Sequence, residues 1–294
     1  MVLKLVFVTC SEAQKRWDGE GKDSLWHNPL NWHPNGVPGI ADDVKIDNSL
    51  LPGKLLISLG NDTVHVNSIS ISSDGEQHTL LIPQVNTRMP VIRLESANTS
   101  LDIGQYTLLL NRSGAPAGNP IEMNGKLAIR NGGAYVHNTS RGNAYLAGKL
   151  LSDSSTSKGK FIFDVPGTSG YTVSLTGRTY GTLQFTSSTG RKSYSGSGSS
   201  DLIVRGDLVI HDSASLTSTL TARIILKGNV DVNGRFNINP VTADTMGRII
   251  ELAGDTGLLK VKGLLETGAN FRGFELSIGK TTMQSDLQLS PGAF

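Results

Sequence analysis

The sequence predicts an all-β protein, a right-handed parallel β-helix in which short strands stack coil upon coil into a solenoid. Three observations lead to this fold class. No stretch of a dozen residues carries apolar side chains at helical spacing, short segments of alternating apolar residues recur along the chain, and the second half contains a repeat. The 34 glycines and 11 prolines among 294 residues fit a chain with many turns.

The predicted strands are segments in which every second residue is apolar, as expected for a sheet with one buried face and one wet face. Their average length is short, and turn-forming residues separate them. They are residues 69–71, 92–94, 101–103, 106–110, 127–129, 161–165, 171–175 and 183–185.

The repeat unit is an apolar triplet, then Gly-Asp or Gly-Asn, then a second apolar stretch. It occurs at residues 202–210, 224–232 and 249–255, with 258–261 after it, so the period is roughly 22 to 26 residues. We expect the glycine to supply a left-handed backbone at each corner and the triplets to form a buried wall. Because one coil alone buries too little apolar surface, the coils must stack.

A β-sandwich is the alternative, because it also contains short strands with frequent turns. The long period favours the solenoid. We divide the chain into a signal-peptide remnant at residues 1–13, a Trp-rich N-terminal cap at 14–47 and β-helix repeats over 48–294. The Ser- and Gly-rich stretch 186–200 is predicted to be a mobile loop or a seam between two blocks of coils.

The charge and the cysteine content exclude several classes of partner and site. The 27 basic and 25 acidic residues leave a net charge of +2, which gives no broad field for nucleic acid or an anionic membrane. The single cysteine, Cys10, excludes an intramolecular disulfide framework and a multi-cysteine metal site. No apolar run approaches the roughly 18 residues that a membrane span needs.

The first residues have the pattern of a short signal peptide. Lys4 precedes an apolar run at residues 5–8, and the small residues Ser11 and Ala13 suit cleavage before Gln14. The alternative is an ordinary first strand at residues 2–8. The signal-peptide interpretation predicts a protein that is secreted or displayed at the cell surface.

All three tryptophans lie in one segment near the N-terminus. Its pattern is made by Trp17, Gly19, Trp26, Asn31, Trp32, Pro38, Asp43, Val44 and Ile46. With these residues the opening resembles that of large surface proteins of the Bacteroidota, many of them exported by the type IX secretion system, and a similar opening precedes the β-helical passengers of some autotransporters. The resemblance implies parallel β-coils directly after the opening and roles from adhesion to polysaccharide degradation. Residues 279–294 do not resemble the usual type IX secretion domain, so we expect a fragment or another export route.

Two interpretations of Trp17, Trp26 and Trp32 remain open. As a cap, the indoles would cover the apolar end of the first coil while their N–H groups reach polar neighbours. As a ligand site, their exposed faces would stack on sugar rings. The interleaved Pro and Asn residues favour the folded cap.

No arrangement of residues indicates catalysis, a metal or a cofactor. The six histidines are scattered, with no metal-ligand spacing and no neighbouring nucleophile. Asp42 and Asp43 are adjacent on a predicted strand, so their side chains point to opposite faces and cannot act on one substrate. Arg205-Gly206-Asp207 has the form of an integrin-binding tripeptide, but the repeat places it at a structural corner.

Four Asp-Ser/Thr-apolar tripeptides match the sequon at which Bacteroidota proteins are O-glycosylated. This expectation depends on the resemblance above, and such tripeptides also arise by chance in a chain rich in serine and threonine. The acceptor hydroxyls belong to Ser24, Thr63, Ser213 and Thr245.

The sequence as a whole therefore predicts a non-enzymatic, secreted or cell-surface protein, structural or adhesive, that self-assembles into a homo-oligomer or filament. The alternative is a carbohydrate-active or carbohydrate-binding β-helix module, similar to polysaccharide lyases or glycosidases. Surface glycans are the expected ligands in both the adhesive and the carbohydrate-binding interpretation.

Overall fold

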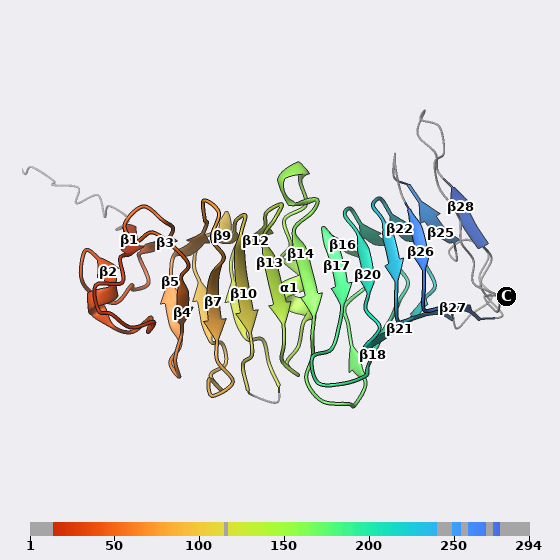
Figure 1. Ribbon diagram of the computed structural model, residues 1–294, viewed down its shortest axis with the longest axis horizontal. Coiled ribbons are helices and arrows are strands. Elements are labelled where there is room, and N and C mark those ends of the chain that lie inside the picture. The colour runs from red at the N-terminus through yellow and green to blue at the C-terminus, as the bar shows by residue number, and fades with distance from the viewer. Residues whose placement is uncertain (1–13, 115–116, 240–248, 254–257, 269–272, 277–294) are drawn as a thin grey trace, which may run out of the picture.

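The computed structural model describes residues 14–114, 117–239, 249–253, 258–268 and 273–276, which form a rod of stacked β-coils (Figure 1). Strands of successive coils pair in parallel, and the one antiparallel pair among the described strands joins β1 (Gln14–Trp17) to β2 (Trp32–His33). The predicted parallel β-helix is confirmed, and the β-sandwich is wrong. The predicted signal segment, residues 1–13, lies outside the described residues.

One sheet, which we call sheet B, runs along the rod with one strand from each of nine coils. Every coil therefore passes through the same flat wall, and the solenoid is continuous from its first coil to its last described one. The strands of sheet B in order are β4 (Leu56–Ser58), β7 (His78–Ile82), β10 (Thr107–Asn111), β13 (Ala134–His137), β14 (Lys160–Phe163), β17 (Thr182–Phe185), β20 (Leu208–Ile210), β23 (Val230–Val232) and β26 (Leu259–Val261).

Two further sheets complete the coils of the N-terminal half. Sheet A contains β1 and β2 together with β3 (Asp43–Ile46), β6 (Ser68–Ile71), β9 (Thr99–Ile103) and β12 (Lys126–Ile129). Sheet C contains β5 (Val64–Val66), β8 (Ile92–Leu94) and β11 (Ile121–Met123).

Two different sheets complete the coils of the C-terminal half. Sheet D contains β15 (Tyr171–Thr172), β18 (Lys192–Gly198), β21 (Ala214–Leu220), β24 (Arg235–Ile238) and β27 (Leu264–Thr267). Sheet E contains β16 (Arg178–Tyr180), β19 (Leu202–Val204), β22 (Ile224–Leu226), β25 (Ile249–Leu252) and β28 (Gly273–Leu276).

The core consists of inward side chains stacked over one another from coil to coil. Each is almost fully buried, and burying one aliphatic side chain stabilises the fold by about 1.5–3 kcal/mol. The aromatic members stack directly, with the Phe163 and Phe185 rings 5.4 Å apart and nearly parallel. The central column of sheet B is Ile57, Leu80, Leu109, Tyr135, Phe161, Leu183, Leu208, Val230 and Leu259.

The glycines of the repeat corners are required for a different reason from the one predicted. Neither Gly206 nor Gly228 has a positive φ, so the expected left-handed backbone is wrong. A Cβ on Gly206 would lie 2.5 Å from Thr182 Oγ1 and 2.6 Å from Ser157 O. A Cβ on Gly228 would lie 2.4 Å from the carbonyl oxygen of Gly206. The corners are glycine because successive coils approach too closely there for any side chain.

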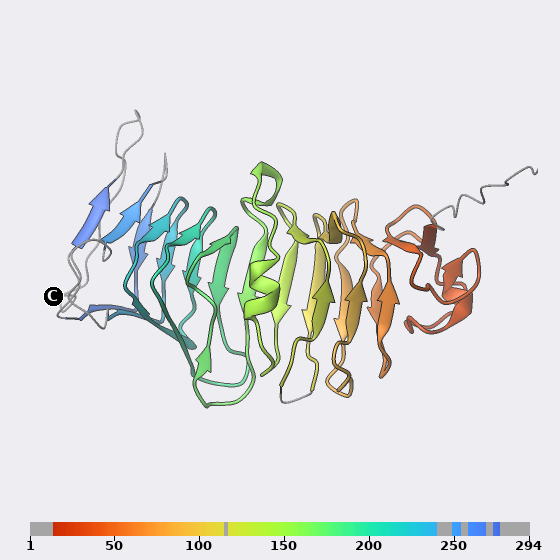
Figure 2. The same cartoon turned by 180° about the vertical axis from the view of Figure 1, so that it is seen from behind.

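The cross-section of the solenoid changes in the middle of the rod. Sheets A and C end at β12 and β11, and the helix α1 (Ala144–Gly148) takes the place of a sheet C strand in the fourth coil (Figure 2). Tyr145 Oη accepts a hydrogen bond from Met123 N at 3.1 Å and donates one to Met123 O at 2.7 Å, which satisfies the edge of β11. Sheets D and E then begin. Within the described residues, no helix is long and apolar enough to cross a bilayer.

The predicted loop or seam at residues 186–200 is in large part a regular strand. β18 fills residues 192–198 and pairs along its whole length with β21, while sheet B continues past it without interruption. Lys192, Tyr194 and Gly196 alternate inward between exposed serines, which anchors the strand. Its polar composition arises because every outward residue is a serine.

The N-terminal cap is confirmed. Trp17, Trp26 and Trp32 are at most 3% exposed, and their rings meet edge to face at 5.1 and 4.7 Å. Trp32 Nε1 donates a hydrogen bond to Trp26 O at 2.7 Å, so the buried indole N–H is satisfied. The 3-10 turn Pro29–Asn31 leads into β2, which covers the outer edge of β1.

Replacing Gly228 with alanine is expected to lower the free energy of unfolding by about 1–3 kcal/mol, because the new methyl group overlaps the backbone of the preceding coil. Gly170→Ala is the matched control, since a Cβ there meets no atom within 4 Å and its φ is not positive. Urea denaturation of the two variants checks this expectation. Equal stability of both would contradict the close-approach explanation.

Candidate functional site

The buried tryptophans cannot serve as a sugar-stacking platform in this conformation, because their ring faces are covered by one another and by the core. Of the predicted acceptor hydroxyls, Thr63 is exposed and its Oγ1 donates to Pro90 O at 2.9 Å, while Ser24 is half-buried. Ser213 is half-buried and its Oγ accepts a hydrogen bond from Ser187 N. Thr245 lies outside the described residues.

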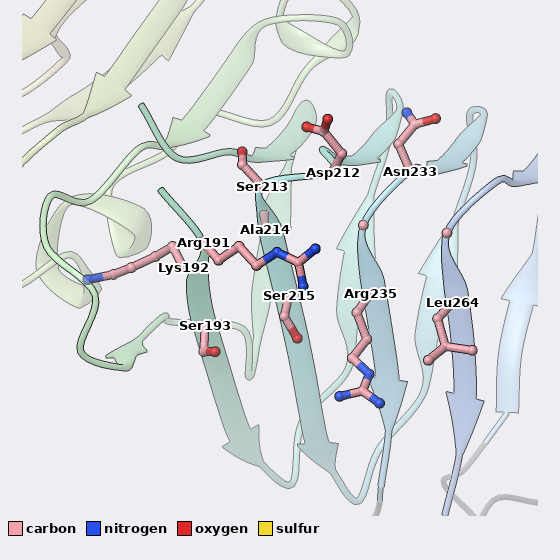
Figure 3. A pocket seen from close by; sticks show the side chains of 12 residues that line it. Arg191, Lys192, Ser193, Asp212, Ser213, Ala214, Ser215, Asn233, Arg235 and Leu264 are labelled. Carbon is pink, nitrogen blue, oxygen red and sulfur yellow. The ribbon is translucent and has the colours of Figure 1, made fainter. Parts of the chain in front are cut away.

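A hollow of about 560 Å³ lies where the strands of sheet D begin, over the turns of four successive coils (Figure 3). The turns stack, so each coil contributes residues at the same height. Arg191 reaches across β21 toward Ser215, while Lys192 points the other way (Figure 3). The hollow is lined by Arg191, Lys192, Ser193, Asp212, Ser213, Ala214, Ser215, Asn233, Gly234, Arg235, Gly263 and Leu264.

The polar groups of this hollow divide into occupied and available ones. Arg235 Nη2 pairs with Glu266 Oε1 at 2.7 Å, and the buried Lys192 Nζ donates to Pro166 O and Gly167 O at 3.0 Å. By contrast, Arg191 and Asp212 have no ion-pair or side-chain hydrogen-bond partner within the described part of the chain. The hollow thus offers one free cation and one free carboxylate beside hydroxyl and amide groups.

The outer face of sheet D continues the hollow with small polar side chains on β18 and β21 and with mixed side chains on β24 and β27. The pairing register places them in straight rows at the spacing of parallel strands, about 4.8 Å. Such an array presents donors and acceptors with little side-chain entropy to lose on binding. One row is Ser193, Ser215, Arg235 and Leu264, and the next is Ser195, Thr217, Asn237 and Glu266.

The adjacent acidic residues bind different partners, and Asp42 precedes β3 instead of lying on the predicted strand. Asp42 Oδ2 accepts from Gly39 N, whereas Asp43 Oδ1 accepts from Asn67 Nδ2 at 2.9 Å and from Ser68 Oγ.

The structural-corner interpretation of Arg205-Gly206-Asp207 is also confirmed. Arg205 Nη1 donates to Asp153 O, and Asp207 Oδ1 accepts from Asn229 N at 2.8 Å. Both side chains are therefore engaged in holding neighbouring coils together. Among the described residues, no group of three or more His, Cys, Asp or Glu side chains gathers in a metal-binding cluster.

Stacking creates a charged ladder on sheet C that the sequence analysis missed. His65 Nε2 lies 2.5 Å from Glu95 Oε1, and Glu95 Oε2 accepts from Asn124 Nδ2 at 3.0 Å. The hydrogen bond from His65 holds the pKa of Glu95 below its usual range, so this carboxylate is ionised and acts as an acceptor. Arg93 and Glu122 pair beside them at 3.1 Å. A search for His and Glu one coil apart, about 30 residues, would have found the pair.

A chain of hydrogen bonds crosses the core at the fourth coil. Asn111 Nδ2 donates to Tyr135 Oη, and Tyr135 Oη lies 3.0 Å from His137 Nδ1. His137 Nε2 lies 2.8 Å from Tyr171 Oη, which itself donates to Arg141 O. This order assigns the ring proton of His137 to Nε2 and leaves the ring neutral. Burial lowers the pKa of His137 to about 4, although the Arg141 carbonyl opposes the shift.

The buried imidazole predicts a loss of stability in mild acid. The pKa of His137 is lower in the folded chain than in the unfolded chain, so its contribution is complete above about pH 6.5 and falls as the pH drops toward 4. By pH 5 the loss is about 2 kcal/mol. His137→Asn, which repeats the residue of the coil below, removes this part of the pH dependence. Urea denaturation at pH 7 and pH 5 measures it, and an unchanged slope in the variant would contradict the assignment.

The comparisons with known proteins add no relative. No protein-family model, no curated protein and no solved structure matches the chain. The resemblance to Bacteroidota surface proteins therefore stays a prediction from sequence. The geometry of the outer faces is therefore the observation from which a function can be inferred.

Proposed function

We propose that this chain is a non-enzymatic, secreted or cell-surface β-solenoid that adheres to glycans through the hollow and the outer face of sheet D. The observation that carries the proposal is that Arg191 and Asp212, which have no side-chain partner among the described residues, line one hollow beside rows of hydroxyl groups. The signal-peptide pattern and the Trp-rich opening support an extracellular location.

The chemistry of the hollow favours a neutral, hydroxyl-rich ligand. A sugar hydroxyl both donates and accepts, and the lining supplies acceptors from Asp212, donors from Arg191 and both from Asn233. The ionic groups of the lining and its Glu266 neighbour nearly balance, so the hollow has no strong preference for a polyanion. Leu264, which is 36% exposed, offers an apolar contact for the ring of a sugar.

The state of the carboxylates argues for binding rather than hydrolysis. Glycosidases need one carboxyl group with a raised pKa beside a second carboxylate. Here Glu95 is held in its charged form by His65, and Asp102 accepts a bidentate hydrogen bond from Arg130. An ionised Glu95 is a poor proton donor near neutral pH.

Asp212→Ala and Arg191→Ala are each expected to weaken glycan binding about tenfold or more, because each removes a charge-assisted hydrogen bond. A glycan array on the wild-type protein selects the ligand, and calorimetric titration then measures the variants. Asp62→Ala is the matched control, since this exposed carboxylate pairs only loosely with Arg88, at 3.5 Å, and lies far along the chain.

Two results would refute the proposal. One is the absence of any glycan ligand on the array. The other is release of unsaturated or shortened products when the protein is incubated with polysaccharides, which would make the chain an enzyme. Equal glycan affinities of Asp212→Ala and Asp62→Ala would show that the glycan binds elsewhere on the protein, which would contradict the assignment to the hollow.

A further inference from the structure

The outer face of sheet B is mainly aliphatic over the first five coils and the cap, with Ser58, Thr79 and Lys160 as its polar positions. Its outward residues alternate with the buried core column, so they point away from the solenoid. An isolated parallel bridge from Leu25 to Ser58 adds the cap to the same row, and Leu25 and Leu56 are 48% and 51% exposed. The aliphatic residues of this face are Leu25, Leu56, Leu81, Leu108, Leu110, Ala134, Val136 and Ile162.

The same positions on the neighbouring sheets are polar. On sheet A the outward row is Lys45, Ser70 and Asp102. On sheet C it is His65, Arg93 and Glu122. The repeat by itself therefore does not account for the leucines of sheet B, because the equivalent outward positions on the other two sheets are polar or charged. A parallel sheet is ordinarily covered on both sides, yet the strands of sheet B stand side by side with no described helix across them (Figure 1).

We infer that this face is an interface between two copies of the chain, packed back to back and antiparallel through their N-terminal halves. A two-fold axis between β7 and β10 places Leu81 of one copy against Leu110 of the other, and Leu25 opposite Ile162. The same axis sets Leu56 against Ala134, while the outward hydroxyl residues Thr79 and Ser58 face Leu108 and Val136. Lys160, at the edge of the overlap on β14, is the charged outward residue of the first five strands of sheet B, and Asp231 and Lys260 lie in later coils beyond the overlap.

The size of the face sets the strength of the pairing. Six strand positions at about 4.8 Å and strands of up to five residues at about 3.3 Å give a face of about 24 by 16 Å. Two such faces bury about 800 Å², or somewhat more with the rim, which is at the low end of specific interfaces. The dimer is therefore weak and reversible. Because sheets B and D are different walls of the coil, both hollows stay free, and two linked sites would raise the avidity for a repetitive ligand.

Charge supports a second copy over a lipid surface. Membrane-binding faces combine apolar residues with an excess of lysine and arginine. Within the overlap the outward residues of the sheet B strands carry one charge, Lys160, and on the later strands Lys260 lies beside Asp231. A flat aliphatic face with a single lysine at its edge suits a copy of itself better than an anionic bilayer.

Sedimentation velocity of the chain over a wide range of concentration tests the interface. We expect a monomer–dimer equilibrium, and Leu110→Lys raises its dissociation constant by about tenfold or more, because an ammonium group would be buried without a partner. Leu81→Lys tests the same face one coil away. Ser70→Lys on sheet A is the control, since it adds the same charge to an outward strand position of another face and should leave the dimer unchanged.

Circular dichroism and thermal melting confirm that each variant is folded, which is expected because the substituted side chains point outward. A monomer at every concentration would overturn the inference. A dimer that persists in both lysine variants would also overturn it. So would oligomers larger than a dimer whose formation is unchanged by Leu110→Lys. Binding of the monomeric protein to phosphatidylcholine vesicles would also overturn it, by assigning the face to lipid.

Discussion

The close spacing of parallel strands, about 4.8 Å from one coil to the next, is the constraint on which the structure depends. It places each residue directly over its counterpart, so that the core is a set of columns rather than a jigsaw of distant segments. The corners must pack at the same spacing, and a Cβ on Gly159 would lie 1.9 Å from Ile129 O. The aromatic pairs Tyr135–Phe161 and Phe163–Phe185, each formed by successive coils, show the same rule with larger side chains.

Much of the fold could be predicted because the repeat contains apolar triplets, and these triplets form β19, β22 and their neighbouring strands. The predicted reason for the corner glycines, a left-handed backbone, was wrong. A sequence shows that a position has no side chain, but it does not show which atoms of the neighbouring coil leave no room for one. The helix α1 was missed because five residues carry no helical periodicity of their own. It forms where a strand would leave the edge of β11 open, and Tyr145 then satisfies that edge.

The candidate site was harder to predict than the fold because it joins residues from different coils. The registers Lys160↔Thr182 and Val230↔Leu259 correspond to coils of 22 and 29 residues, so the offset between stacked positions varies along the chain. His65 and Glu95, or Asp212 and Arg235, therefore come together without a fixed spacing that a motif could encode. The stretch 186–200 was predicted as a loop or seam for a related reason. Its outward serines make the sequence polar, so the alternation of the inward residues Lys192 and Tyr194 is not recognised as a strand pattern.

A solenoid separates stability from function more completely than a globular domain does. Inward residues fill the columns, while outward residues of the same strands repeat their chemistry along one wall: hydroxyl groups on sheet D, charges on sheet C and leucines on sheet B. Because outward side chains contribute little to the core, selection can change one wall without disturbing the others. The aliphatic wall is therefore informative. Leu25 and Leu56 are exposed and the other leucines of this face are half-buried, so the isolated chain leaves part of their apolar surface in water. Their concentration on one face supports the interface inferred above.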